Sequence, residues 1–345
     1  MSESKSMILG VAGPELTPEE EAFFRAERPW GFILFGRNVV SSDQLRRLTD
    51  ALRSCLADPG IPILIDQEGG RVQRLRPPLA PNYPPAIRIG ELFDRDEAAG
   101  RRAAWLLGRL HALDLAAHGI NVDCVPVLDV PAEGSHEVIG QRAYHRDPET
   151  VALLASDTAE GLMAGGLLPV MKHMPGHGRA NADTHFDLPV VDTPLDELAR
   201  IDFLPFRRLN TLPMGMSAHV VFSAIDRSAP ATQSAQVIEQ VIRGAIGFDG
   251  LLMTDDLSMN ALKGDLGERA AAALSAGCDV ALHCNGKMDE MELVARAAGA
   301  LNGEPLVRAE KARASFQPAR PCDGEALRQE FDHLISAGTG AVAVA

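Results

Sequence analysis

Polar and charged residues follow five short apolar runs of this sequence, at the point where each run ends. Carboxylate, imidazole and ammonium groups of this kind transfer protons, hold metal ions or bind polar substrates. Their recurrence at several run ends favours a shared site over isolated loop charges. The residues are Asp66, Gln67, Glu68 and Arg71 after the third run along the chain, Asp129 after the fourth, Lys172, His173 and His177 at the fifth, Ser217 and His219 at the sixth, and Asp255 and Asp256 at the seventh.

A metal site is one interpretation of these residues. His173 and His177 have the four-residue spacing of two ligands on one helical face. Pro175 and Gly176 lie between them and would not hold a helix. A mixed ligand set of the kind found in metal-dependent barrel hydrolases nevertheless stays open, formed by Asp129, His173, His219 and Asp255.

A Schiff base is a second interpretation. Lys172 ends an apolar run, where a desolvated amine becomes nucleophilic. The neighbouring residues are cationic or neutral, and no Gly-rich phosphate motif follows the later runs, so this chemistry has little further support.

Glycoside hydrolysis is the third interpretation, and it needs a carboxylate beside the anomeric carbon and a proton donor for the leaving group. Asp255, at a strand end, is a rigidly held candidate nucleophile. Asp183 and His185 lie two residues apart in a loop, so in extended backbone their side chains point the same way. A carboxylate that orients an imidazole forms an acid/base pair that works near neutral pH. A turn-forming Asp183 and a packed His185 remain the plain structural alternative.

The elements that must position these residues alternate regularly along the chain. Near-continuous apolar runs predict strands buried on both faces, and the stretches between them show helical spacing. Eight such units in about 300 residues predict a (β/α)8 barrel, in which the carboxyl ends of all strands meet at one mouth. The predicted strands are 7–12, 31–35, 61–66, 121–129, 168–172, 214–219, 250–255 and 278–284. The predicted helices are 17–28, 41–56, 95–117, 147–163, 194–209, 234–245, 266–276 and 288–301.

The alternative fold is a doubly wound open sheet. It requires a Gly-rich turn after the first strand, but Pro14 follows Gly13 and no third Gly completes the motif. No linker rich in Pro, Gly or Ser divides the chain. We therefore expect one catalytic domain over residues 1–345, with the barrel at about 7–301. A peripheral C-terminal segment follows at 302–345, with helices at 311–316 and 325–335, and a Pro-rich loop at 71–92 covers the barrel mouth.

Composition narrows the function further. The 33 basic and 47 acidic residues give a net charge of −14, so nucleic acid is not an expected partner. No apolar run reaches the 18 residues of a membrane span, and the N-terminus lacks a signal-peptide pattern. Five scattered Cys without a C-x-x-C pair indicate reduced thiols. We expect a cytoplasmic protein that does not bind membranes.

Three long strings resemble one known family. LIDQEGGRVQRL (64–75), KHMPGHGRANADTH (172–185) and GLLMTDDLSM (250–259) are similar to bacterial β-N-acetylglucosaminidases of glycoside hydrolase family 3, and within it to the single-domain, cytoplasmic NagZ type. The similarity extends from about residue 7 to 300. Met174 and Thr184 stand where the family usually has Phe and Ser, and both departures are mild.

The resemblance implies a (β/α)8 barrel enzyme that retains anomeric configuration through a covalent glycosyl-enzyme. It implies no cofactor and no metal, and a monomer that acts on small carbohydrates, namely peptidoglycan fragments that end in 1,6-anhydro-N-acetylmuramic acid. It also implies roles for single residues, with Asp255 as nucleophile, His185 as acid/base assisted by Asp183, and Asp66, Arg74, Arg142, Lys172 and His173 as ligands of the terminal N-acetylglucosamine. A sugar-binding protein without turnover remains the non-enzymatic alternative.

The other polar and soft residues have structural interpretations. Glu68 is expected to hold its loop or an Arg, Asp256 to orient backbone or a neighbouring Arg, and Asp129 and His219 to support the pocket from behind. We expect a solvated helix face at Arg101, Arg102 and Arg109. We expect buried thiols at Cys124 and Cys278, and core-filling side chains at Met163, Met171, Met214, Met216 and Met253.

Overall fold

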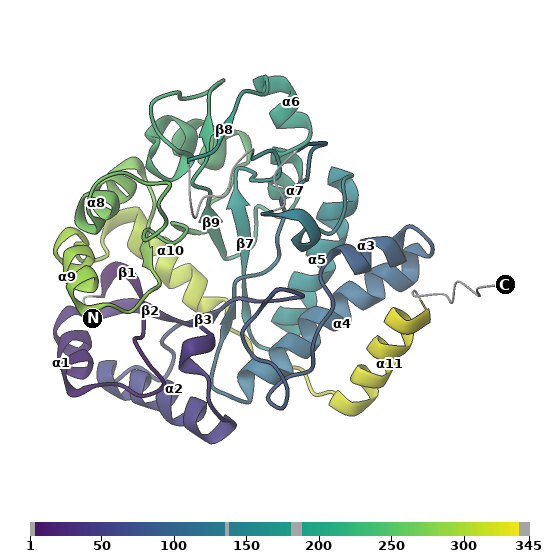
Figure 1. Ribbon diagram of the computed structural model, residues 1–345, viewed down its shortest axis with the longest axis horizontal. Helices are drawn as coiled ribbons and strands as arrows, with labels where there is room; N and C mark the ends of the chain where they lie inside the picture. Colours follow the sequence, from purple (N-terminus) through teal and green to yellow (C-terminus); the bar gives the residue numbers. More distant parts are fainter. Residues whose placement is uncertain (1–3, 135–137, 181–187, 338–345) are drawn as a thin grey trace.

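Eight parallel strands form a closed barrel at the centre of the molecule (Figure 1). The computed structural model describes residues 4–134, 138–180 and 188–337. A parallel bridge between Met253 and Val280 joins the two ends of the eight-stranded sheet. The (β/α)8 barrel that the sequence predicts is confirmed. In order around the sheet, the strands are β11 (Leu251–Met253), β9 (Met214–Ser217), β7 (Leu168–Met174), β6 (Val122–Asp123), β3 (Ile63–Ile65), β2 (Pro29–Leu34), β1 (Lys5–Gly10) and β12 (Ala281–His283).

Helices surround the barrel, and short strand pairs lie outside it. Loop residues form the antiparallel pair β4 (Gln67–Gly69) and β5 (Val72–Gln73) and the parallel pair β8 (Val190–Val191) and β10 (Val221–Phe222). The helices are α1 (Pro18–Glu27), α2 (Ser42–Leu56), α3 (Ile87–Phe93), α4 (Glu97–Ala116), α5 (Pro148–Ala164), α6 (Leu195–Arg200), α7 (Phe203–Arg208), the wide helix η4 (Val237–Ala245), α8 (Leu266–Ala276), α9 (Met288–Ala297), α10 (Gly303–Ala314) and α11 (Gly324–Ala337), with one-turn helices at η1 (Gly36–Asn38), η2 (Gly140–Arg142) and η3 (Ala231–Gln233).

Side-chain caps start several of these helices where the sequence predicts. The Thr17 side chain accepts from the Glu20 N–H at the start of α1, and Ser41 does the same for Gln44 in α2. Asp147 accepts from the Thr150 N–H at 2.8 Å and opens α5. These bonds satisfy N–H groups that the first helical turn leaves free, which fixes where each helix begins.

Strand residues are buried on both faces, which explains their near-continuous apolar sequence. One set of side chains points outward against the helices and belongs to the larger core cluster, which includes Met7, Leu9, Phe32, Leu34, Ile63 and Ile65. The alternate set fills the barrel interior and forms a second cluster, which includes Ile8, Ile33, Leu64, Val170, Met216, Met253 and Leu282. The interior is therefore a packed core rather than a channel.

Helix α10 covers the amino-terminal end of the barrel, behind the strands in the view of Figure 1. Ala309 and Ala312 are buried in the interior cluster together with Trp30, and Leu306 and Phe316 pack against it. The helix predicted over 311–316 is wrong in extent, because burial against the barrel, rather than local propensity, sets its bounds at Gly303–Ala314. The predicted helix 325–335 corresponds to α11, which packs against α4 (Figure 1).

Two other predicted elements differ from the structure. The helix predicted over 194–209 is two helices, α6 and α7, because Pro205 has no N–H for an interior turn and lies instead in the first turn of α7. The strand predicted over 121–129 is shorter in the structure, where β6 covers two residues. Beyond β6, the described residues of this stretch make only one isolated parallel bridge, from Val127 to Lys172. The Pro-rich stretch 71–92 contains β5 and most of α3.

Two expectations about single side chains are wrong. Arg109 does not lie on a solvated face: it is 2% exposed and donates to the Arg320 carbonyl and, at 3.0 Å, to Cys322 Sγ, because residues before α11 cover α4. Met163 is 40% exposed and does not fill the core. Met171, Met214, Met216 and Met253, like Cys124 and Cys278, are buried as expected. None of the helices in the described ranges combines the length and apolarity needed to cross a membrane.

Candidate active site

A cavity of about 160 Å³ opens at the carboxyl ends of the barrel strands. Its walls combine charged groups from the ends of four barrel strands and the loops after them with apolar side chains of the barrel interior. Four carboxylates and three Lys or Arg side chains line it, so the cavity carries no large excess of charge and suits a neutral ligand with many hydroxyl groups. The charged lining residues are Asp66, Glu68, Asp255, Asp256, Arg74, Arg142 and Lys172, and the apolar ones include Ile33, Phe35, Val72, Val138, Ile139, Met216, Met259 and Leu282.

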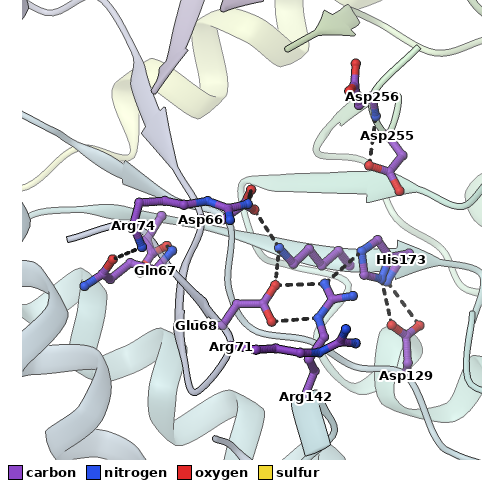
Figure 2. A network of polar contacts seen from close by, with 12 residues as sticks. Asp66, Gln67, Glu68, Arg71, Arg74, Asp129, Arg142, His173, Asp255 and Asp256 are labelled. Atoms are coloured by element: carbon purple, nitrogen blue, oxygen red, sulfur yellow. Dashed lines mark hydrogen bonds and ion pairs between the residues drawn. The ribbon is translucent and has the colours of Figure 1, made fainter. Parts of the chain in front are cut away.

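Asp66 follows β3 directly and binds two cations. Its Oδ1 accepts from Lys172 Nζ at 2.9 Å and its Oδ2 accepts from Arg74 Nη2 at 3.0 Å (Figure 2). Burial alone would raise the pKa of this carboxyl, but Lys172 and Arg74 outweigh burial and hold the pKa well below its usual range. Asp66 is therefore an ionised hydrogen-bond acceptor near neutral pH.

Glu68 lies on β4 and binds Lys172, the same amine that binds Asp66, together with Arg142. Arg142 donates to both of its oxygens at 2.8 Å, and Lys172 Nζ lies 2.7 Å from Oε1. Burial opposes ionisation, but Arg142 and Lys172 lower the pKa of Glu68 to about 2. Burial likewise opposes the charge on Lys172, and Asp66 and Glu68 overcome it and raise the pKa of the amine.

His173 follows Lys172 on β7 and is oriented by a buried carboxylate. Its Nδ1–H donates to Asp129 Oδ2 at 2.7 Å, which leaves Nε2 as the acceptor, 3.5 Å from Arg142 Nη2 (Figure 2). Asp129 also accepts from the N–H of His173 and, at 2.7 Å, of His177. The expectation that Asp129 supports the pocket from behind is consistent with these bonds. Burial, followed by the nearby His173, lowers the pKa of His177 to about 4, so this second imidazole in the wall is neutral near pH 7.

Asp255 follows β11 and lies across the cavity from His173 (Figure 2). Its Oδ1 accepts from the Asp256 N–H at 2.8 Å. Burial alone would raise the pKa of Asp255, but the influence of His173 and His219 and the Asp256 bond lower it. The second oxygen has no hydrogen-bond partner among the described residues. Asp255 is thus an ionised, fixed carboxylate in the cavity wall, which is the state of a nucleophile.

Asp256 and His219 hold this strand end in place. Asp256 accepts from the Ser258 N–H and hydroxyl and from the Cys284 N–H, and it therefore orients backbone as expected. His219 Nε2–H donates to the Asp256 carbonyl at 3.0 Å, and its Nδ1 lies 2.9 Å from Thr232 Oγ1. His219 thus stands behind the nucleophile candidate.

The structure brings together six of the eight predicted site residues, from elements far apart in the chain: Asp66, Arg74, Arg142, Lys172, His173 and Asp255 all line the one cavity. The two others, Asp183 and His185, lie outside the described residues. The Schiff-base interpretation is not supported, because Lys172 is held as a cation between two carboxylates. Within the described ranges, no group of three or more His, Cys, Asp or Glu side chains is arranged to hold a metal ion.

Phe35 belongs to the site and was missed from the sequence, whereas His177 and Gln67 were named there among the strand-end residues but were given no role in binding the sugar. Phe35 and His177 line the cavity. Gln67 is fully buried, and its Oε1 accepts from the N–H groups of Arg74 and Leu75 at 3.0 Å, which fixes the return of the β4–β5 hairpin. Phe35 is the last residue of the predicted second strand, so the rule that strand ends face the mouth would have found it if applied to apolar residues as well.

Comparison with known proteins gives the family. Residues 16–314 match the model of the glycosyl hydrolase family 3 N-terminal domain, which is most of the chain. The chain belongs to glycosyl hydrolase family 3. The family and the enzyme class that the sequence motifs predict, a glycoside hydrolase, are thereby confirmed.

Relatives of this family 3 enzyme cover most of its length. A β-hexosaminidase of Alkalilimnicola ehrlichii is 42% identical over 283 residues, which is 81% of this chain and 80% of the relative. A β-hexosaminidase of Aromatoleum aromaticum is 39% identical over 319 residues, or 91% and 89% of the two chains. Among solved structures, NagZ from Neisseria gonorrhoeae in complex with N-trifluoroacetyl-D-glucosamine has a TM-score of 0.84 at 32% identity and covers 98% of each chain.

Proposed function

We propose that this family 3 glycoside hydrolase is a retaining exo-β-N-acetylglucosaminidase that uses Asp255 as its nucleophile. The observation that carries the proposal is the cavity itself, in which an ionised aspartate faces a cluster of polar groups suited to a single neutral sugar. The similarity to proteins named β-hexosaminidase, and to a NagZ that binds an N-acylated glucosamine, supports N-acetylglucosamine as that sugar.

In the first step, a carboxylate oxygen of Asp255 attacks the anomeric carbon while the bond from that carbon to the leaving oxygen breaks. His185, as an imidazolium, gives its proton to the leaving oxygen. In the second step neutral His185 takes a proton from water, and the resulting hydroxide attacks the anomeric carbon and releases Asp255. Two inversions give net retention. Asp183 would orient His185 and stabilise its charge, and both residues lie outside the described ranges.

The remaining predicted residues bind the sugar. Ionised Asp66 would accept hydrogen bonds from sugar hydroxyls, and Lys172, Arg74 and Arg142 would donate to oxygens. His173 presents Nε2 as an acceptor because Asp129 takes its other proton. These groups are already paired with one another, so little rearrangement would be needed when the sugar arrives, and their orientation costs little at the moment of reaction.

The similarity to NagZ also supports a biological role. We propose that the natural substrates are peptidoglycan fragments with terminal β-linked N-acetylglucosamine followed by 1,6-anhydro-N-acetylmuramic acid, and that the protein acts in cell-wall recycling as a cytoplasmic monomer. We further propose that the barrel and the segment after it work as one catalytic domain, because α10 packs against the barrel interior and α11 against α4.

A substrate panel tests the activity. The enzyme should release N-acetylglucosamine from aryl β-N-acetylglucosaminides, and proton NMR at early times should show the β-anomer as first product. An α-anomer would refute the covalent mechanism on Asp255, and no turnover despite sugar binding would support a binding protein instead. Turnover abolished by a chelator and restored by a metal ion would support the metal-dependent hydrolase.

A further inference from the structure

The ring of Phe35 lies in the cavity wall and close to two arginines. The guanidinium carbon of Arg74 is 5.1 Å from the ring centroid, and that of Arg37 is 5.0 Å from it. Both distances fall in the range where a cation is attracted to an aromatic face. Arg74 also donates to Asp66, so the ring and the carboxylate hold one guanidinium from two sides.

Arg74 has few other polar contacts. Its Nη2 binds Asp66 at 3.0 Å, while its Nε is buried without a hydrogen-bond partner within the described part of the chain. A long side chain with one ion pair keeps much of its rotational freedom, and fixing it for sugar binding costs conformational entropy. The Phe35 ring restricts this freedom before the sugar arrives.

Phe35 is itself held rigidly, by the residues that follow it. Its N–H donates to Asn38 Oδ1 at 2.9 Å, and Asn38 Nδ2 donates to the carbonyls of Val11 at 3.0 Å and Gly13 at 2.7 Å. Asn38 is fully buried. The turn that carries the ring is thereby anchored to the chain that leaves β1.

Arg37, the second arginine near the ring, is itself held in place by backbone carbonyls. Its Nε–H donates to the Val11 carbonyl at 2.9 Å and its Nη2 to the Cys284 carbonyl, so it joins the chain ends that leave β1 and β12. A Cβ on Gly10 would approach the Cys284 carbonyl oxygen to 2.1 Å, which shows how closely these strands meet. Arg37 is thus a fixed cation beside the ring.

We infer that Phe35 is a positioning residue for sugar binding: it holds Arg74 in the pose that pairs with Asp66 and donates to the substrate, with Arg37 as its fixed support. This inference rests on the proposed function of the same cavity. It assigns Phe35 to the binding of the sugar rather than to bond cleavage, so loss of the ring should act on KM far more than on kcat.

The test compares Phe35→Leu, which removes the ring, with Phe35→Tyr, which keeps it. Turnover of an aryl N-acetylglucosaminide should show KM raised roughly 5–20-fold in the Leu variant with kcat within about twofold, since a partly desolvated cation–aromatic contact has about this strength. KM of the Tyr variant should stay within about threefold of wild type. Trp105→Leu serves as control, because Trp105 stacks on Arg102 at 4.8 Å outside the cavity, and its KM should not change.

A double-mutant cycle separates positioning from direct contact with the sugar. Combined with Arg74→Met, the Phe35→Leu change should cost less than about twofold in kcat/KM, because the ring then has no guanidinium to hold. An equal cost with and without Arg74 would overturn the inference and leave the proposed function intact. Equal melting temperatures of wild type and variants show that the fold is kept.

A crystal structure of the Phe35→Leu variant provides a readout that does not depend on turnover. Arg74 should leave Asp66 or occupy several conformers, and an unchanged Arg74 would overturn the inference. If wild type neither cleaves nor binds N-acetylglucosamine, the proposed function fails, and this structure still decides whether Phe35 positions Arg74.

Discussion

Replacement of Glu68 by Gln tests the electrostatic account of the site most directly. The change keeps the shape of the side chain and removes its charge. In the wild type Glu68 is 6% exposed, binds Arg142 through both oxygens at 2.8 Å, and lies 2.7 Å from Lys172 Nζ. The variant therefore leaves one buried guanidinium without a carboxylate, while Lys172 keeps Asp66.

The expected loss follows from this geometry. Removal of one partner of a buried ion pair costs about 3–5 kcal/mol, because the other charge stays buried and uncompensated. Gln can still accept one hydrogen bond from Arg142, so we expect the lower end, about 3 kcal/mol, which for a protein of this size lowers the melting temperature by roughly 4 °C. Sugar binding should weaken as well, because Arg142 and Lys172 lose the anion that orients them.

Thermal unfolding of wild type and variant at several pH values measures this. The pKa of Glu68 is lowered to about 2, below its ordinary value of 4.5, so its stabilisation is complete above pH 4.5 and disappears as the pH falls toward 2. The gap between the two proteins should be widest near pH 7 and should shrink below pH 4.

A matched control is Glu149→Gln. Glu149 accepts from Arg208 through both oxygens at 3.2 and 2.7 Å, but both side chains are half or more exposed. Solvent screens such a pair, so the control should melt like the wild type. A Glu68 variant that melts like the wild type, or two variants that lose the same amount, would refute the electrostatic account.

Three further predictions concern the nucleophile, the loop after β7 and the neutral histidine. Asp255→Asn should lower kcat by about 10⁴-fold or more with an unchanged melting temperature, and an initial-rate assay that finds more than a tenth of wild-type kcat would contradict the nucleophile assignment. Gly178→Ala should be strongly destabilising in thermal unfolding, because its Cβ would lie 2.0 Å from the Val130 carbonyl oxygen, whereas Gly13→Ala, which meets nothing within 4 Å, should not; equal melting temperatures would contradict this. The pKa of His177 lies at about 4, below its ordinary 6.5, so the wild type should lose stability as the pH falls from about 6.5 to 4. The His177→Asn variant should lose less stability over this range, and melting temperatures with equal acid sensitivity would contradict the prediction.

The barrel could be predicted because its signals are local and repeated. Five of the eight strand ends are marked by polar residues after an apolar run, and parallel strands bring all these ends to one face. Asp66, Lys172 and Asp255 could therefore be placed in one site without any coordinates. The bounds of α10 could not, since a short Ala-containing stretch becomes a helix there through burial against the barrel.

The remaining side chains depend on contacts between segments far apart in the sequence. Arg142 pairs with Glu68 across 74 residues from a one-turn helix, and no periodicity marks either residue as a partner of the other. Resemblance to a family, rather than spacing, pointed to Arg142. The burial of Arg109 has the same origin, because the segment that covers it follows about 211 residues later. The contacts of Phe35 with Arg37 and Arg74 needed the tertiary structure.

Helix α10 covers the amino-terminal end of the barrel, and this limits the paths by which substrate and water can reach the cavity. In the part of the chain that the structure describes, side chains of the barrel and of α10 fill the interior beneath the cavity. A sugar unit held there would be reached from the mouth side of the barrel and not through its interior. In the proposed two-step mechanism, the water of the second step would enter from this same side, through the space that the leaving group occupied, so the leaving group would have to depart before hydrolysis.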